Sequence, residues 1–218
     1  MDQKDIFISS EGDAWYKRNS SCISSFDASA DPIIKILSNM NIKPSSVAEI
    51  GCSSGYRLAE LKKLLQCRCM GIDPSSEAIH SGTTLFQDIE IKIGTADKLP
   101  WNDDSIDLLI YGFCLYLCDR KDLFIIAAEA DRVLKENGII VIYDFSPGVP
   151  IKNQYSHYEG AFSYKMDYSQ LFLWNPSYYL LTSQAMTHSI NTNISDRNER
   201  VSVSVLMKSS DLAYLNNT

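Results

Sequence analysis

The stretch SVAEIGCSSGY (residues 46–56) combines a short apolar run with two closely spaced glycines. Val47 to Ile50 are apolar except for Glu49, and Gly51 and Gly55 follow at once. From Tyr56 onward, apolar residues recur at helical spacing. Small residues between a strand and a helix let backbone N–H groups approach a polar ligand at the helix N-terminus. The stretch therefore predicts a strand, a ligand-binding turn and a helix.

The same turn also fits the pattern G-x-S-x-G, in which the serine is a catalytic nucleophile. In that fold several strands precede the serine and one supplies the oxyanion-hole loop. Here only a segment of helical character precedes Val47, and no HGGG-like run exists in the chain. Chain order alone would supply the rest of a triad, from His157 or His188 and Asp144. The pattern favours a nucleotide-type turn in which Ser53 replaces a glycine, and a serine hydrolase is the minor alternative.

Outward from the turn, apolar runs alternate with segments of helical period. Strands are expected at 47–51, 68–73, 89–96, 106–117 and 139–147, and helices at 56–66, 75–85 and 121–136, the last ending at Asn137-Gly138. Ser75 or Ser76 is expected to cap the helix at 75–85. Hydrophobic strands that alternate with helices indicate a Rossmann-like, doubly wound α/β sheet of five or more parallel strands. Residues 178–188 and 200–209 are expected to close it as an antiparallel hairpin. Such sheets bind ligands at the carboxyl ends of their strands.

Two segments lie outside this alternation. Residues 1–45 are expected to form an N-terminal helical cap, with Asp31 as the N-cap and Pro32 as the first residue of one helix. Residues 46–218 are expected to form the main domain, and the segment 148–177 within it is rich in aromatic residues without a steady period. A long aromatic insertion at the ligand end of a sheet is either a substrate lid or a segment that packs on the sheet. Both interpretations are open.

The composition excludes several classes of partner. The net charge is −7 over 218 residues and no run of Lys or Arg is present, which argues against a nucleic-acid partner. The longest apolar run, Leu108 to Cys118, is too short to span a bilayer, so no membrane partner is expected. No apolar signal core is seen near Met1, and a cytoplasmic protein is expected. No set of acidic or cysteine ligands has metal-site spacing, so no metal is expected.

Two acidic residues stand where a ligand is expected. Glu49 lies in an otherwise apolar strand, where a carboxylate is costly unless it serves a site. Asp73 ends the second strand, the position from which such folds recognise the hydroxyls of an adenosine ribose. The turn lacks the third glycine of G-x-G-x-x-G, which disfavours NAD, and no G-K-[ST] indicates a P-loop.

Four stretches, in order and in register over about residues 45–147, resemble the class I S-adenosylmethionine-dependent methyltransferases. They are AEIGCSSG (48–55), with Ser53 in place of the family's middle glycine, GIDPS (71–75), GTADKLPW (94–101) followed by DDSIDLLI, and RVLKENGIIVIYDF (132–145). The resemblance implies the seven-stranded methyltransferase fold and S-adenosyl-L-methionine as the cofactor. It also implies a methyl transfer enzyme.

The resemblance implies roles for particular residues. Glu49 would organise the turn and the methionine end of the cofactor, and the turn itself would pass beneath that end with Gly51, Cys52, Ser53 and Gly55. Asp73 would hold the ribose hydroxyls, and Pro74 would lie against the adenine. Ala96 and Asp97 would contact the adenine edge, and Tyr111 would line the methionine moiety.

Two outlying stretches are similar to segments of bacterial methyltransferases associated with surface-sugar biosynthesis. In EGDAWYKRN (11–19), Trp15, Arg18 and Asn19 would cap the cofactor, and residues 153–172 would hold the acceptor. By this resemblance the acceptor is a small molecule, with a sugar or sugar nucleotide preferred. A hydroxyl or carbon acceptor needs a base, and histidine is the residue type whose unperturbed pKa suits proton transfer near neutrality. His157, within the aromatic-rich segment, is the first candidate, and Tyr155 is a weaker one. A non-catalytic, cofactor-binding partner subunit is the alternative to an enzyme, and the oligomeric state is not predicted.

Overall fold

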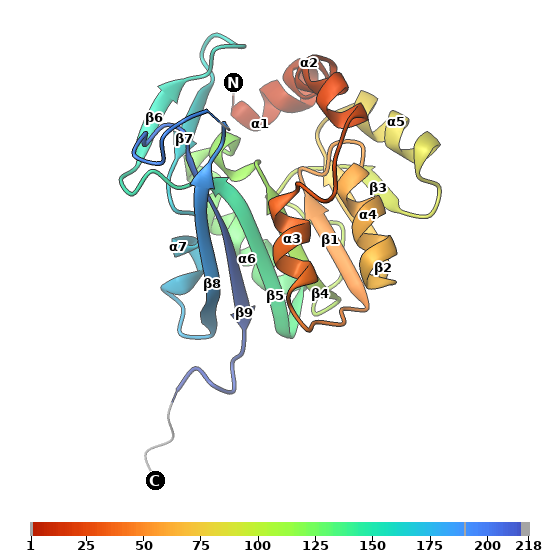
Figure 1. The fold of residues 1–218 in the computed structure, drawn as a ribbon, viewed down its shortest axis with the longest axis vertical. Coiled ribbons are helices and arrows are strands. Elements are labelled where there is room, and N and C mark those ends of the chain that lie inside the picture. Colours follow the sequence, from red (N-terminus) through yellow and green to blue (C-terminus); the bar gives the residue numbers. More distant parts are fainter. Residues whose placement is uncertain (1, 190, 215–218) are drawn as a thin grey trace.

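The computed structural model of the protein describes residues 2–189 and 191–214. A sheet of seven strands lies at the centre of this described part, in the order β3-β2-β1-β4-β5-β9-β8 (Figure 1). The strands are Ser46–Ile50 (β1), Arg68–Asp73 (β2), Glu90–Ile93 (β3), Ile106–Gly112 (β4), Leu134–Phe145 (β5), Tyr178–Thr187 (β8) and Arg200–Lys208 (β9). β1 to β5 pair in parallel, whereas β9 is antiparallel to both β5 and β8. The expected doubly wound sheet with a closing hairpin is confirmed.

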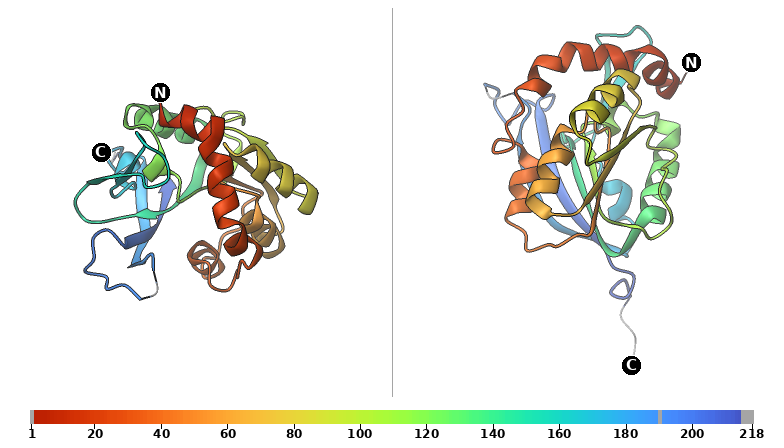
Figure 2. Two further views of the ribbon diagram at one scale, coloured as in Figure 1. Left: turned by 90° about the horizontal axis from the view of Figure 1, so that it is seen from above. Right: turned by 90° about the vertical axis from the view of Figure 1, so that its right-hand side faces the viewer.

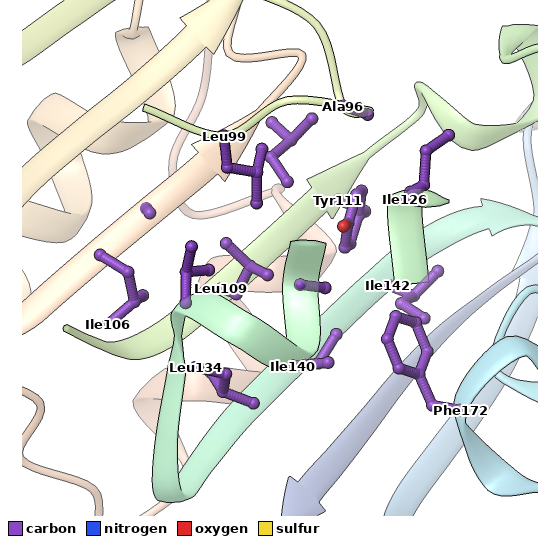
Figure 3. Packing of buried hydrophobic residues seen from close by; sticks show 14 of the residues in the cluster. Ala96, Leu99, Ile106, Leu109, Tyr111, Ile126, Leu134, Ile140, Ile142 and Phe172 are labelled. Atoms are coloured by element: carbon purple, nitrogen blue, oxygen red, sulfur yellow. The ribbon is translucent and has the colours of Figure 1, made fainter. Parts of the chain in front are cut away.

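Helices cover both faces of the sheet, which explains why its strands are apolar throughout. On one face lie α3 (Pro32–Ser38), α4 (Tyr56–Leu65) and α5 (Ser76–Leu85), and their buried side chains form one hydrophobic core with the sheet. On the other face lie α6 (Leu123–Val133) and α7 (Gln170–Leu173). Figure 3 shows part of this second core, in which Tyr111 and Ile142 of the sheet lie beside Ile126 and Phe172. Each large apolar side chain buried in these cores contributes about 1.5–3 kcal/mol.

Side-chain caps fix the start of two helices, as the sequence predicts. The Asp31 carboxylate accepts a hydrogen bond from the Ile34 N–H at 2.9 Å, with Pro32 at the first helical position of α3. The Ser75 hydroxyl accepts from the Ala78 N–H at 3.0 Å and begins α5. These caps satisfy backbone donors that have no partner within the helix.

The chain leaves β1 toward β2 and β3, then crosses back to place β4 on the other side of β1. Such a reversal opens a crevice at the carboxyl ends of the strands. The connection from β3 to β4 contains no helix within the described residues, only a bridge between Thr95 and Lys98. Above this edge run α1 (Gln3–Ile6), a π-helical turn η1 (Phe7–Glu11) and α2 (Gly12–Ser24), as both views in Figure 2 show.

The aromatic-rich insertion forms a second, smaller sheet. β6 (Ile151–Gln154) and β7 (Phe162–Lys165) pair in antiparallel fashion and lie near α1 in Figure 1. The turn between them packs Tyr155 and Ala161 against Ile6 of α1. Further along, Tyr168 and Phe172 pack into the core on the α6 face. The insertion therefore contacts the N-terminal helices with one part and the sheet with the other.

Several expected element boundaries are wrong. The strand expected at 106–117 ends at Gly112, because Phe113 takes a left-handed backbone with φ 54° and the turn η2 (Leu115–Leu117) follows. The helix expected to end at Asn137-Gly138 ends at Val133, and β5 begins at Leu134. The carbonyls of Arg132 and Val133 accept hydrogen bonds from the N–H groups of Asp104 and Ser105, at 2.9 Å each. The loop before β4 thus takes the last helical acceptors, a tertiary contact that local patterns do not contain.

The third strand is also shorter than expected, spanning Glu90–Ile93 rather than 89–96. Over the described residues, none of the helices combines the length and the apolar character needed to cross a membrane.

Candidate active site

The glycine turn between β1 and α4 has the backbone that its sequence indicates. Gly51, Ser53 and Gly55 all have left-handed conformations, with φ of 74°, 51° and 78°. Gly51 also lets the turn pack closely against Cys114, because a Cβ at position 51 would lie 2.8 Å from the Cys114 Cβ. The N–H groups of Gly51 and Cys52 donate to the Ile72 carbonyl at 2.9 and 3.0 Å. The turn is therefore fixed against the end of β2.

Asp73 completes this attachment. Its two carboxylate oxygens accept from the backbone N–H groups of Ser53 and Ser75, at 2.8 Å each. Burial raises the pKa of Asp73 to about 6, although the two backbone donors act in the opposite direction. Each oxygen keeps capacity for a further donor, since a carboxylate offers about four acceptor sites. Asp73 is thus an ionised acceptor near neutral pH, placed beneath the turn.

A cavity of about 480 Å³ opens above the turn and Asp73. Its size lies within the range of small-molecule sites, about 300–1,000 Å³. Residues of the N-terminal helices, the strand ends, the β6–β7 hairpin and the end of β8 all line it. The cavity is therefore made by segments from nearly the whole length of the chain.

Most residues expected to bind the cofactor lie in the wall of this one cavity. They are Trp15, Asn19, Gly51, Ser53, Asp73, Pro74, Ala96 and Asp97. Asp97 receives an ion pair from Lys4 of α1 at 2.6 Å, and Lys4 lines the cavity as well. Hydrogen bonds from Lys4 and Thr95 outweigh burial and lower the pKa of Asp97. Lys4 was not foreseen, because nothing in the local sequence connects it to a residue so distant along the chain.

Five expected residues do not line the cavity: Arg18, Glu49, Cys52, Gly55 and Tyr111. Cys52 is turned toward Gly71, where an added Cβ would lie 2.7 Å from its Sγ. Tyr111 is fully buried in the core on the α6 face (Figure 3), and its hydroxyl has no hydrogen-bond partner within the described residues. Gly55 caps the start of α4. Cys52, Gly55 and Tyr111 therefore shape the turn and the sheet without forming the cavity wall.

Glu49 belongs to a buried ion-pair cluster one layer below the wall. Its Oε1 pairs with Arg57, whose Nε also donates to Asp31 at 3.0 Å. Arg57 does line the cavity. The second oxygen of Glu49 is buried and has no hydrogen-bond partner within the described residues. A buried, half-satisfied carboxylate is costly, which is a feature of ligand-binding sites more than of structural cores.

Arg18 and Tyr155 meet at a contact between α2 and the insertion. The Tyr155 hydroxyl donates to the buried Glu11 carboxylate at 2.9 Å, and Arg18 pairs with the same carboxylate. Arg18 Nη2 also lies 3.3 Å from the Tyr155 oxygen. Burial raises the pKa of Tyr155, and the hydrogen bond to Glu11 adds to the rise. Tyr155 lines the cavity as a neutral hydroxyl at ordinary pH.

The two candidate histidines occupy different places. His157 lies outside the cavity wall, with its ring centroid 5.3 Å from that of Tyr155. His188, which the sequence suggested only as a member of the disfavoured serine triad, lines the cavity, and its Nδ1 lies 3.7 Å from Glu199 Oε2. The role of His157 as a base stays a prediction. His188 is a second candidate that the sequence pattern did not single out, since only the β8–β9 hairpin brings it to this edge.

The geometry of a serine nucleophile is absent from the described part of the chain. The Ser53 hydroxyl is buried and makes no hydrogen bond there, whereas a nucleophile needs a base within hydrogen-bond reach. Within the same described part, no group of three or more His, Cys, Asp or Glu side chains is arranged to bind a metal ion.

Comparison with known proteins agrees with the fold. Residues 48–142 match the protein family described as methyltransferase domain. An uncharacterised methyltransferase of Bacillus subtilis strain 168, YcgJ, is 27% identical over 116 residues, covering 50% of this chain and 44% of that protein. The chain spans about half the length of the curated relatives it matches.

Two solved structures show the same fold over most of the chain. A SAM-dependent methyltransferase from Methanosarcina mazei has a TM-score of 0.65 at 18% identity, over 82% of this chain and 98% of that one. A chain from the complex of the Haloferax volcanii Trm112 methyltransferase activator with a putative methyltransferase has a TM-score of 0.71 at 16% identity, over 97% of this chain and 100% of that one. The fold is the Rossmann-like methyltransferase fold.

Proposed function

We propose that this chain transfers a methyl group from S-adenosyl-L-methionine to a small-molecule acceptor. The observation that carries the proposal is Asp73, a buried carboxylate that lines the cavity and fixes the left-handed turn through the Ser53 N–H. A carboxylate at the end of the second strand suits the two hydroxyls of a ribose. The family match over residues 48–142 supports the same cofactor.

The wall residues fit the parts of this cofactor. Asp73 would accept from the ribose hydroxyls, with Pro74, Ala96 and Asp97 around the adenine. The turn at Gly51 and Ser53 would lie beneath the methionine end, where the Ser53 hydroxyl and Glu49 Oε2 are buried polar atoms still without partners among the described residues. When bound, the cofactor supplies a methyl group on a sulfonium, which is already a good leaving group. The chain's task is then to position the acceptor and exclude water.

Residues 1–45 are proposed to act as the cap and the 148–177 insertion as the lid of this site. Trp15 and Asn19 of α2 and Tyr155 of the insertion all line the cavity. The contact of Tyr155 and Arg18 with Glu11 joins the two segments. For an acceptor that must lose a proton, the base is proposed to be a histidine, His157 or His188.

The acceptor expected from the sequence, a sugar or sugar nucleotide, is the first candidate for a substrate screen. A partner subunit that binds the cofactor without catalysis would show cofactor binding and no methyl transfer to any acceptor tested. A serine hydrolase would be labelled by a serine-reactive phosphonate, and Ser53→Ala would abolish the labelling.

The decisive experiment is thermal unfolding with S-adenosylmethionine, with S-adenosylhomocysteine and with NAD as the control. A ligand at 100 times its dissociation constant stabilises the folded state by about 2.7 kcal/mol. For a domain of this size the midpoint should rise by roughly 5–10 °C. Both sulfur nucleotides should produce the shift and NAD should not. Ser53→Gly should retain it, because glycine adopts the left-handed conformation at position 53 without strain. No shift with either sulfur nucleotide would refute the proposal.

A further inference from the structure

Four aromatic rings from four parts of the chain form one section of the cavity wall. Phe113 follows β4, Tyr116 lies in η2, Phe145 ends β5 and His188 follows β8. The ring centroid of Phe113 lies 6.3 Å from that of Tyr116, 5.4 Å from that of Phe145 and 5.2 Å from that of His188. These residues are called the four-ring wall below. None of the residues assigned to the cofactor belongs to it.

The backbone at Phe113 holds this arrangement at a cost. Its φ of 54° is left-handed, which is uncommon for a residue with a bulky side chain. The Phe113 N–H donates to the Tyr143 carbonyl at 2.8 Å, and the two rings pack with centroids 4.4 Å apart. Strained residues of this kind cluster where a side chain must be presented to a ligand. The strain at Phe113 points to a ligand at the four-ring wall.

Lys165 of β7 lies against the same wall. Ser163 and Lys165 line the cavity, whereas the alternate residues Phe162 and Tyr164 turn their rings toward Lys152 on the other face of the hairpin. Lys165 Nζ lies 3.7 Å from the centroid of the Phe145 ring and donates to the Asn198 carbonyl. Its ammonium is therefore fixed beside an aromatic face of the cavity.

The charge of Lys165 is not compensated by a carboxylate in contact, within the residues that the structure describes. Glu199, Asp196 and Asp144 act on it only from a distance, and burial lowers its pKa. The other cations of the wall are paired, Lys4 with Asp97 and Arg57 with two carboxylates. A half-buried ammonium with free donors favours an anionic partner, because a charge-assisted hydrogen bond recovers part of its lost solvation.

We infer that the four-ring wall and Lys165 form an acceptor subsite for a planar aromatic acid. The ring of the acid stacks on the wall, and its carboxylate pairs with the Lys165 ammonium. The inference rests on the proposed function, since it names the acceptor class for the same cavity. A cationic acceptor would face Lys165 with a like charge, and a neutral one would leave the ammonium unpaired.

The test is calorimetric titration of the full chain with 1-naphthoate and its neutral counterpart 1-naphthamide. Each titration is run with and without saturating S-adenosylhomocysteine, so that no turnover occurs. The acid should bind about tenfold more tightly than the amide, the difference expected for one charge-assisted hydrogen bond. Lys165→Met should remove this preference.

Lys152→Met is the matched control, because Lys152 lies on the same hairpin and over the Phe162 ring but outside the cavity. It should keep the preference for the acid. Phe145→Leu should weaken the binding of the acid and of the amide by the same factor, because the substitution removes a ring of the wall and no charge. The midpoint of thermal unfolding of each variant verifies that it is folded.

The outcomes separate this inference from the proposed function. Suppose that S-adenosylhomocysteine binds but the protein shows no preference for the acid, or does not bind 1-naphthoate at millimolar concentration. Either result overturns the acceptor subsite alone. An equal loss of preference in Lys152→Met and Lys165→Met overturns it as well. No binding of S-adenosylhomocysteine refutes the proposed function, and the titrations without it still decide whether the subsite prefers an acid.

Discussion

At the scale of single residues, Asp73 has the clearest assignment to test. Asp73→Asn keeps the shape of the side chain but removes its charge and one acceptor. The affinity for S-adenosylhomocysteine should fall about tenfold to a hundredfold, which corresponds to hydrogen bonds to a charged group at about 1.5–3 kcal/mol. Calorimetric titration at pH 7.5 measures the change.

Asp144→Asn is the control for this substitution. Asp144 is also buried at the end of a strand and accepts backbone hydrogen bonds from Phe145 and Tyr116, but it does not line the cavity. Its substitution should leave the affinity within about twofold, a free-energy difference below about 0.5 kcal/mol. In the unmodified protein the affinity should weaken as pH falls below about 6, where Asp73 takes up a proton. An affinity independent of pH from 5 to 8 would contradict the role of the Asp73 charge.

The two histidines give a second residue-scale prediction. His188→Ala should lower the rate of methyl transfer more than His157→Ala, because His188 lines the cavity and His157 does not. Loss of a general base costs about a hundredfold or more in rate. The rate is measured with radiolabelled S-adenosylmethionine and the acceptor that the screen yields. A larger loss in His157→Ala would restore the assignment made from the sequence.

At the scale of elements, the docking of α2 on α5 determines whether the cavity is covered. Asp13 accepts from the Ser75 and Ser76 hydroxyls and from the Glu77 N–H, at 2.7, 3.1 and 3.0 Å. It therefore bonds to donors in the first turn of α5, among them the Glu77 N–H, which has no partner within the helix. Gly12 lets the helices approach, because a Cβ there would lie 3.2 Å from the Ser75 nitrogen.

Asp13→Ala should loosen α2 without unfolding the sheet, at a cost of about 1–2 kcal/mol for the lost cap-like contacts. Hydrogen exchange at amides 12–24 should accelerate about fivefold or more, whereas exchange in β1 and β4 stays unchanged. Asp27→Ala is the control, since Asp27 is exposed and bonds only within its own turn. Equal exchange in the two variants would show that Asp13 does not hold α2.

Features that depend on residues close together in the sequence were predicted correctly, whereas features that depend on contacts between distant segments were not. The turn at Gly51, the caps at Asp31 and Ser75 and the alternation of strands depend on neighbours along the chain, and the structure confirms them. The end of α6 depends on hydrogen bonds from Asp104 and Ser105, so the local stop signal at Asn137-Gly138 predicted the wrong end for this helix.

The cavity wall shows the same division. Gly51, Ser53 and Asp73 lie in motifs with a recognisable order, and these motifs led to the edge of the sheet at which the cavity opens. Lys4 and His188 come from segments with no such motif, and Lys165 lies in the stretch 153–172, which the resemblance assigned to the acceptor only as a whole. Their side chains reach the cavity only through the packing of the N-terminal helices, the β6–β7 hairpin and the β8–β9 hairpin, and no short-range pattern encodes that packing.

At the scale of the whole molecule, buried carboxylates link stability to pH. Burial raises the pKa of Asp144 to about 7 against backbone hydrogen bonds that lower it. Between pH 4 and 7 the folded state therefore holds a proton that the unfolded state has released. Proton linkage then requires the contribution of Asp144 to the free energy of unfolding to fall as pH rises through this window.

Asp144→Asn should remove that contribution. The free energy of unfolding of the variant, relative to the unmodified protein, should rise steadily from about pH 4 to about pH 7 and level off above it. Urea unfolding at a series of pH values measures the difference. Carboxylates with lowered pKa, such as Asp97 and Asp107, are common to both proteins and cancel. A difference that does not change with pH would show that Asp144 is ionised throughout the window.

The position of β9 between β5 and β8 has a consequence for synthesis on the ribosome. β8 is made before β9, but it has no neighbour in the sheet until β9 pairs with β5. β1 to β5 can associate while translation continues, whereas β8 and the His188 that follows it must wait for Lys208 to emerge. The nascent chain therefore carries an unpaired strand for some seconds, at synthesis rates of about 5–20 residues per second. Over that interval both edges of β8 lack a strand partner, the condition under which strands pair with other chains and aggregate.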